Sequence, residues 1–120
     1  MTKSQKTELN KLLHQACVLR DSGRCLRCGT SEKLQMSHIY PKGTHRKMEY
    51  DLDNVKTLCW NCHFNWWHKS PVEAWRWLEK TISKERLTRL DIRANTVDKS
   101  PQDFKLLKIY LQQEIKKYTL

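Results

Sequence analysis

The sequence predicts a small α+β domain stapled by one metal ion, with a helix before the stapled core and several helices after it. Two Cys-x-x-Cys pairs stand thirty residues apart. Two short strand-like segments lie between them, and helical patterns flank the region on both sides. At 120 residues we expect a single domain, divided into an N-terminal helix (6–24), a stapled core (25–69) and a helical C-terminal region (70–120).

The elements follow from local patterns. Residues 6–20 place apolar side chains at helical spacing, whereas residues 34–39 and 54–58 are predicted to be strands joined by a polar loop. Ser70, Pro71 and Glu73 form a helix start signal, with Ser70 as N-cap and Glu73 closing a capping box. A similar signal at residues 100–103 precedes a last helix, and residues 82–94 suggest another helix between them.

Charge is the strongest compositional signal. Twenty-three Lys and Arg against thirteen Asp and Glu give a net charge of +10. Such a surface attracts polyanions, so we expect DNA as the partner. No apolar run is long enough to span a bilayer, and residues 1–15 lack a secretory apolar segment. The expected location is therefore the cytoplasm, which would be the host-cell cytoplasm for a phage-encoded protein.

The two cysteine pairs predict one structural zinc site formed by Cys25, Cys28, Cys59 and Cys62. Four thiolates suit tetrahedral Zn²⁺, and Gly29 fits the positive-φ turn that follows such a pair. A redox pair or an iron–sulfur cluster explains the second pair less simply. Four cysteines fill the coordination of zinc, so the nearby histidines are left for another role.

The order and spacing of these residues resemble the HNH, or ββα-metal, endonuclease family. The matching residues are Cys25-x-x-Cys28, Ser37-His38-Ile39, Asn54, and Leu58-Cys59-x-x-Cys62-His63. The segments YDLDN, LCWNCH and WWHKSP are also similar to small phage-type members related to the NinG/Rap recombination endonucleases.

The resemblance implies a role for each matching residue. His38 matches the general base, Asn54 matches the asparagine that ties the hairpin loop and orients that base, and His63 matches a ligand of a catalytic divalent ion. Mg²⁺ or Mn²⁺ is expected there. Cleavage would leave 5′-phosphate and 3′-hydroxyl ends. A histidine that titrates near neutrality suits the base role on physical grounds as well.

One position departs from the family pattern, because Ser37 stands where Asp or His is usual as a second metal ligand. Either Ser37 binds the ion through water, or His68 supplies the missing contact, or the site is inactive. His68 lies five residues after His63, one too many for a regular helical pair. Joint ligation by the two histidines therefore requires an irregular helix.

Several other residues are expected to contact nucleic acid or to fill the core. Core packing is expected for Trp67, for Trp75, and for Cys17 in the first helix. Phosphate contacts are expected from Arg24, Arg27, Lys42, His45, Arg46, Lys47 and Lys69. The alternative to an endonuclease is a non-catalytic zinc-ribbon-like nucleic-acid-binding module, which Ser37 favours. The sequence leaves open the form of the DNA substrate and whether the protein is a monomer or a homodimer.

Overall fold

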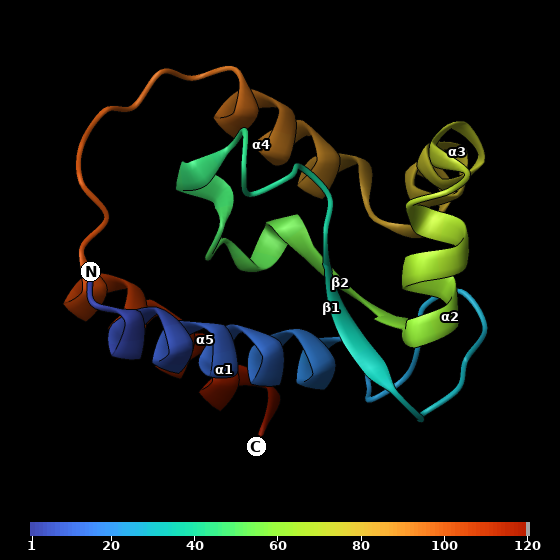
Figure 1. Ribbon diagram of the computed structural model, residues 1–120, viewed down its shortest axis with the longest axis horizontal. Helices are drawn as coiled ribbons and strands as arrows, with labels where there is room; N and C mark the ends of the chain where they lie inside the picture. The colour runs from blue at the N-terminus through green and yellow to red at the C-terminus, as the bar shows by residue number, and fades with distance from the viewer. Residues whose placement is uncertain (120) are drawn as a thin grey trace.

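The computed structural model describes residues 1–119 and has the predicted α+β architecture, with a two-stranded sheet at its centre and helices around it (Figure 1). Three short turns, η1, η2 and the π-helical η3, join the helices and strands. In chain order the elements are α1 (Lys3–Arg20), β1 (Leu34–His38), η1 (Arg46–Met48), η2 (Leu52–Asn54), β2 (Val55–Cys59), α2 (Trp60–Cys62), η3 (His63–Trp67), α3 (Pro71–Thr81), α4 (Lys84–Ala94) and α5 (Phe104–Tyr118).

The sheet sets the positions of the functional residues. Strands β1 and β2 pair in antiparallel fashion, with Leu34 opposite Cys59 and His38 opposite Val55. One end of the sheet therefore carries a predicted zinc ligand, and the other end carries the predicted base. All five residues of β2 are buried, because helices and loops cover both of its faces.

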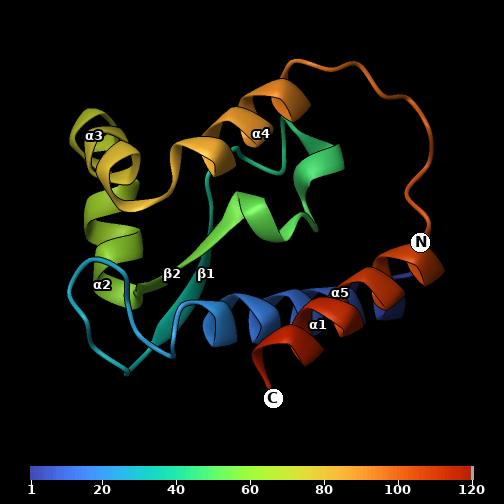
Figure 2. The ribbon, with the colours of Figure 1, turned by 180° about the vertical axis from the view of Figure 1, so that it is seen from behind.

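The first helix is longer at its start than expected and ends at Arg20 rather than near residue 24. Its N-cap is Thr2, whose side chain accepts a hydrogen bond from the Gln5 N–H, while the Gln5 side chain accepts one from the Thr2 N–H. This capping box fixes the first turn. Helix α5 packs along α1 (Figures 1 and 2) and buries Leu111 in the cluster that contains Leu13 and Cys17. Core packing of Cys17 is thus confirmed.

Two helix starts differ from the expectation. Ser70 is the N-cap of α3 and Pro71 its first residue, but the Ser70 side chain makes no capping hydrogen bond, so the capping box with Glu73 does not form. Helix α5 begins at Phe104, with Asp103 as the N-cap whose side chain accepts from the Leu106 N–H. Asp103, which directly precedes the apolar pattern, therefore caps the helix in place of Ser100.

The burial of α3 differs from the core packing expected for Trp75. Ala74 and Leu78 are buried, whereas Val72 is 66% exposed and Trp75 is 37% exposed. Trp66, rather than Trp75, packs in the cluster around the cysteines, and Trp67 is partly buried against it.

Helix α4 is held against η2 by arginines. Arg86 donates from Nε to the Asp53 carbonyl over 2.9 Å and from Nη2 to the Val55 carbonyl over 2.6 Å. Arg93 Nη1 lies 2.7 Å from a carboxylate oxygen of Asp51. Residues 95–103 then lead back to the N-terminal end of α1, where α5 begins (Figure 2). Within residues 1–119, no helix has the length and apolar character that a membrane crossing requires.

Candidate active site and zinc centre

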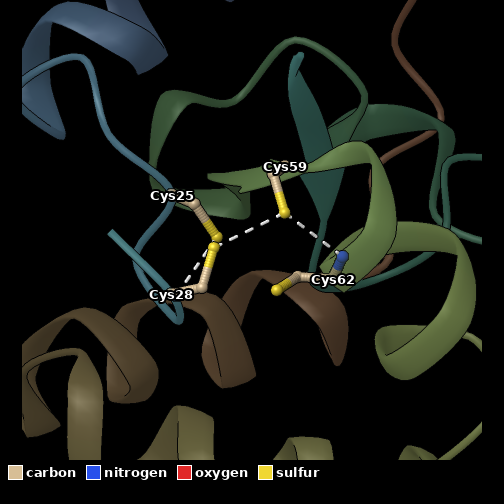
Figure 3. Close-up of side chains that lie close together, drawn as sticks. All are labelled: Cys25, Cys28, Cys59 and Cys62. Carbon is tan, nitrogen blue, oxygen red and sulfur yellow. Dashed lines mark hydrogen bonds between the residues drawn. The ribbon is translucent and has the colours of Figure 1, made fainter. Parts of the chain in front are cut away.

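The four cysteines come together at one end of the sheet (Figure 3). Their sulfur atoms all lie within 4.8 Å of one another, and the Cys28 and Cys59 sulfurs are 3.6 Å apart. Sulfurs bound tetrahedrally to zinc at ~2.3 Å would be about 3.8 Å apart, so the cluster fits a zinc ion closely. None of the five cysteines, all of which are described, forms a disulfide.

Local backbone geometry prepares both pairs for metal. The Cys28 N–H donates to Cys25 Sγ over 3.5 Å, and the Cys62 N–H donates to Cys59 Sγ over 3.4 Å. Burial alone would raise the pKa of the Cys25 thiol, but backbone N–H groups lower it to about 7. Gly29 has φ +81°, as the turn after the first pair requires. Thiolates formed this way are the metal-binding species.

Asn54 ties together the loop between the strands. Its side-chain oxygen accepts from the Tyr40 N–H over 2.8 Å, and its Nδ2 donates to the Tyr40 and Met48 carbonyls, each over 3.0 Å. Asn54 is fully buried, so water does not compete for these bonds. The side chain therefore fixes both ends of the loop that follows His38.

His38 lies at the end of β1, and its ring is fixed by one hydrogen bond. Its Nε2 is 2.9 Å from the Glu49 carbonyl oxygen. A carbonyl only accepts, so Nε2 carries the proton and the lone pair is on Nδ1. Burial, with the charge of Lys42 acting in the same direction, lowers the pKa of His38 below its ordinary value. A neutral imidazole with a free lone pair can accept a proton at neutral pH.

The π-helical turn η3 brings His63 and His68 together. The His68 N–H donates to the His63 carbonyl over 3.3 Å, which is the i→i+5 bond of a π-turn. This wider turn places the fifth residue, instead of the fourth, on the same face. The two Nε2 atoms are consequently 3.3 Å apart. The irregular helix required for joint ligation is present.

The distance between these nitrogens suits a shared ion. Two imidazole nitrogens bound to one ion at ~2.1 Å, at an angle of roughly 90–110°, lie about 3.0–3.4 Å apart. Burial, together with His68, Lys56 and His38, lowers the pKa of His63 to about 4. His63 is therefore neutral at physiological pH, as a ligand must be.

Ser37 contacts His63 on the side away from the cleft. It is fully buried and does not line the cleft. Its Oγ is 3.0 Å from His63 Nδ1 and accepts a hydrogen bond from Lys56 Nζ over 2.9 Å. The expectation that Ser37 binds an ion through water does not fit this burial. Lys56 is itself fully buried, and its ammonium lies 3.2 Å from the centre of the Trp67 ring. Burial lowers its pKa well below the ordinary value.

The three histidines line one cleft of about 500 Å³. Strand β1 supplies His38, η3 supplies His63 and Trp67, and His68 follows directly. The loop after β1 contributes Lys42, and α1 contributes Asn10. No Asp or Glu lines this cleft among the described residues. The arrangement can hold a divalent ion between two imidazoles, place a cationic side chain near a phosphate and offer one neutral imidazole as a proton acceptor.

Residues 25–65 match the family model for HNH endonucleases. This HNH segment covers about a third of the chain and contains both cysteine pairs, His38, Asn54 and His63. It ends before His68. Searches of curated proteins and of solved structures found no significant match, so the likeness to NinG/Rap endonucleases stays a prediction.

The predicted phosphate-binding residues are spread around the HNH segment. Lys42 lines the cleft, and His45 packs its ring on Tyr40 with centroids 5.1 Å apart. Arg27 is engaged internally, since its guanidinium stacks 4.0 Å from the Trp66 ring centre and donates to Cys62 Sγ. Lys47 binds Ser100 and Asp98 away from the cleft. Arg24, Arg46 and Lys69 are exposed.

Sequence reasoning missed two contributors to the site. Asn10 comes from α1, and nothing in the helical pattern marks it. Lys56 lies in a five-residue strand where a lysine normally indicates a solvent-facing position. Its burial became apparent only from the helices that cover both faces of β2. The sequence around Lys56 contains no pattern that predicts its burial.

Proposed function

We propose that this protein is a metal-dependent endonuclease that hydrolyses DNA phosphodiester bonds and leaves 5′-phosphate and 3′-hydroxyl ends. The observation that carries the proposal is the convergence of His38, His63 and His68 on one cleft within and beside the HNH segment. A net charge of +10 supports a polyanionic substrate.

His63 and His68 would hold the ion, which when bound would neutralise the scissile phosphate and the departing 3′ oxygen. Imidazole nitrogens suit first-row transition ions, whereas Mg²⁺ prefers oxygen. The donor set therefore favours Mn²⁺ over Mg²⁺.

The chain's own residues perform the proton chemistry. Glu49 holds the Nε2 proton of His38 through its carbonyl, so Nδ1 accepts the proton of the attacking water. Asn54 keeps the loop that carries Glu49 in register with β1, because it binds the carbonyls of Tyr40 and Met48. Lys42, at the rim of the cleft, attracts the phosphate.

The test is a plasmid-nicking assay with the zinc-loaded protein in Mn²⁺ and, separately, in Mg²⁺. The His38→Ala variant should lose about 10²–10⁴-fold in rate, the usual contribution of a positioned general base. The matched control is His14→Ala, an exposed histidine on α1, which should cut at the parent rate. Zinc content and thermal unfolding should be unchanged in both variants. Cleavage by His38→Ala at the parent rate would refute the assigned mechanism.

One observation favours a second candidate, a non-catalytic nucleic-acid-binding module. The cleft lining contains no carboxylate among the described residues, and carboxylates are the usual ligands of hard divalent ions. This candidate predicts DNA binding that weakens with salt but no cleavage with any divalent ion. The nicking assay separates the two functions.

A further inference from the structure

A continuous chain of polar contacts runs behind the histidine pair. Lys56 Nζ donates to Ser37 Oγ over 2.9 Å, Ser37 Oγ lies 3.0 Å from His63 Nδ1, and His63 Nε2 lies 3.3 Å from His68 Nε2. Lys56 and Ser37 are both fully buried. Water therefore does not substitute for any member of this part of the chain, and the orientation of each group depends on its neighbour.

One arrangement of protons satisfies this row of contacts when no ion is bound. Lys56 donates to one lone pair of Ser37 Oγ, which leaves the hydroxyl proton and the second lone pair for His63. If the hydroxyl donates to His63 Nδ1, the imidazole proton is on Nε2. That proton then points to His68 Nε2, which accepts it. Every donor in the row has an acceptor in this arrangement.

A bound ion would require the opposite tautomer of His63. A ligating Nε2 needs its lone pair, so the single proton of the neutral ring must move to Nδ1. Ser37 serves this tautomer as well, because its second lone pair can accept the Nδ1–H while Lys56 keeps the oxygen in place. A carboxylate at position 37 would only accept, and an alanine would do neither. His68 uses the same lone pair in both states and needs no change.

We propose that Ser37, held by Lys56, is a positioning residue that allows His63 to exchange tautomers when the catalytic ion binds. The inference rests on the proposed metal site and deepens it, because it gives Ser37 a role other than ligation. The exchange is balanced: the Nε2 proton leaves to water in the cleft, and Nδ1 takes the hydroxyl proton of Ser37, which Lys56 Nζ replaces, so the ring stays neutral. The lysine fixes the hydroxyl, and the hydroxyl accommodates both proton positions.

The direct test is the tautomer of His63, read from imidazole ¹⁵N chemical shifts of the full chain. The first equivalent of Zn²⁺ fills the cysteine site, and a second equivalent serves as the diamagnetic probe for the histidines. We expect the proton on Nε2 of His63 before the second equivalent and on Nδ1 after it, with His68 unchanged. A proton on Nδ1 of His63 in both states would overturn the proposal.

The second test is the affinity for that second equivalent. Ser37→Ala alone would also strand the buried amine of Lys56, so the informative variant is the double change Ser37→Ala with Lys56→Met, in which His63 Nδ1 is the only group that loses its partner. Its affinity should fall by about 10–100-fold, as expected when the partner of a ligating histidine is lost. The control Ser70→Ala, at a serine that makes no capping hydrogen bond, should bind like the parent.

The outcomes separate this inference from the proposed function. If the double variant binds the probe within about twofold of the parent, well short of the usual effect of such partners, the role of Ser37 is refuted and the metal site stands. If the parent protein takes up no second equivalent, both the metal site and the role of Ser37 are overturned. Neither readout requires DNA cleavage.

Discussion

His38 differs from the other two histidines of the cleft because its Nε2 is already bonded to the Glu49 carbonyl. The bond selects one tautomer, while burial lowers the pKa of the ring. His63 and His68 instead face each other through their Nε2 atoms. In the proposed mechanism the first imidazole accepts a proton and the other two share an ion.

The lowered pKa of His38 makes a prediction about pH. The base acts when neutral, and its neutral fraction rises with pH through the pKa of the folded protein. Because that pKa lies below the ordinary 6.5, the rate should climb on the acid side and be level by pH 7. A pH–rate profile of kcat/KM, with His14→Ala as the control, measures this. A midpoint above 6.5 would contradict the assignment.

The sequence predicted which residues meet in a site where their spacing follows a known motif. The two Cys-x-x-Cys pairs were identified correctly as one cluster, because their spacing has few other interpretations. The approach of His63 to His68 depends on the π-turn. From the sequence we could say that an irregular helix was required, but not that it would form. The placement of Ser37 could not be predicted, since it depends on Lys56 being buried by elements distant in sequence.

The π-turn η3 is the element on which the histidine pair depends. Its i→i+5 bond between the His68 N–H and the His63 carbonyl is long, at 3.3 Å, and His68 is exposed. A turn of this kind opens readily by itself. An ion shared by the two side chains would therefore act as a clamp on the backbone.

Hydrogen exchange can detect this clamp. We expect the His68 amide to exchange more slowly after a divalent ion is added to zinc-loaded protein, because ligation and the turn stabilise each other. Mass spectrometry of the peptide that spans 63–68 measures it, and α5 provides an internal reference that should not change. Equal exchange with and without the ion would show that the turn and the site are uncoupled.

Helix α4 depends on Arg86, which caps two carbonyls next to the strand end. The change Arg86→Met should lower the free energy of unfolding by about 1–3 kcal/mol, since the Asp53 carbonyl loses its donor and the Val55 carbonyl keeps only Arg20 Nη2. Arg89→Met removes an ion pair with Asp53 in which Arg89 is half exposed and should have a much smaller effect. Urea denaturation at fixed zinc concentration compares the two variants, and equal losses would contradict this account.

Helix boundaries were the least predictable part of each element. The first helix was expected over residues 6–24 and the last from residue 100, but Thr2 and Asp103 are the caps. The start of α3 at Ser70 was predicted correctly. Several polar side chains near a helix start can serve as its cap. The two strands were easier to predict, because both segments between the cysteine pairs carry strand-like residues.

The zinc centre joins parts of the molecule that are far apart in sequence. Cys25 and Cys28 follow α1, whereas Cys59 ends β2 and Cys62 lies in α2. One segment of ten residues, 59–68, begins with a cysteine of the cluster and ends with His68 of the cleft. We therefore expect folding of the cleft to depend on metal binding at the other end of the sheet.

Loss of zinc should unfold the core. The variant Cys59→Ser is expected to lose the ion and cooperative thermal unfolding, because structural zinc contributes about 10–16 kcal/mol of apparent binding free energy, comparable to the stability of a whole domain. Cys17→Ala, at a buried cysteine outside the cluster, should keep one zinc per chain. Zinc analysis and circular dichroism measure both. A Cys59→Ser protein that melts like the parent would contradict a structural role.

For the whole molecule, the local strand and helix patterns predicted the α+β class, and composition predicted the basic charge. It did not predict that α1 and α5 would pack side by side or that α4 would lie on the η2 loop. Those contacts join residues far apart in the sequence, and the apolar patterns of three amphipathic helices allow several arrangements.

The π-turn also has a consequence for chain length. A π-turn is equivalent to one residue inserted into an ordinary helix, so the number of residues between His63 and His68 matters as much as their identity. Deleting one exposed residue there would restore a regular helix and rotate the second imidazole away from the first. The segment 95–99 joins α4 to α5 through an exposed loop, and changes of length there would leave the site intact. Relatives that keep this pair should therefore vary in length in that loop and keep the spacing of five.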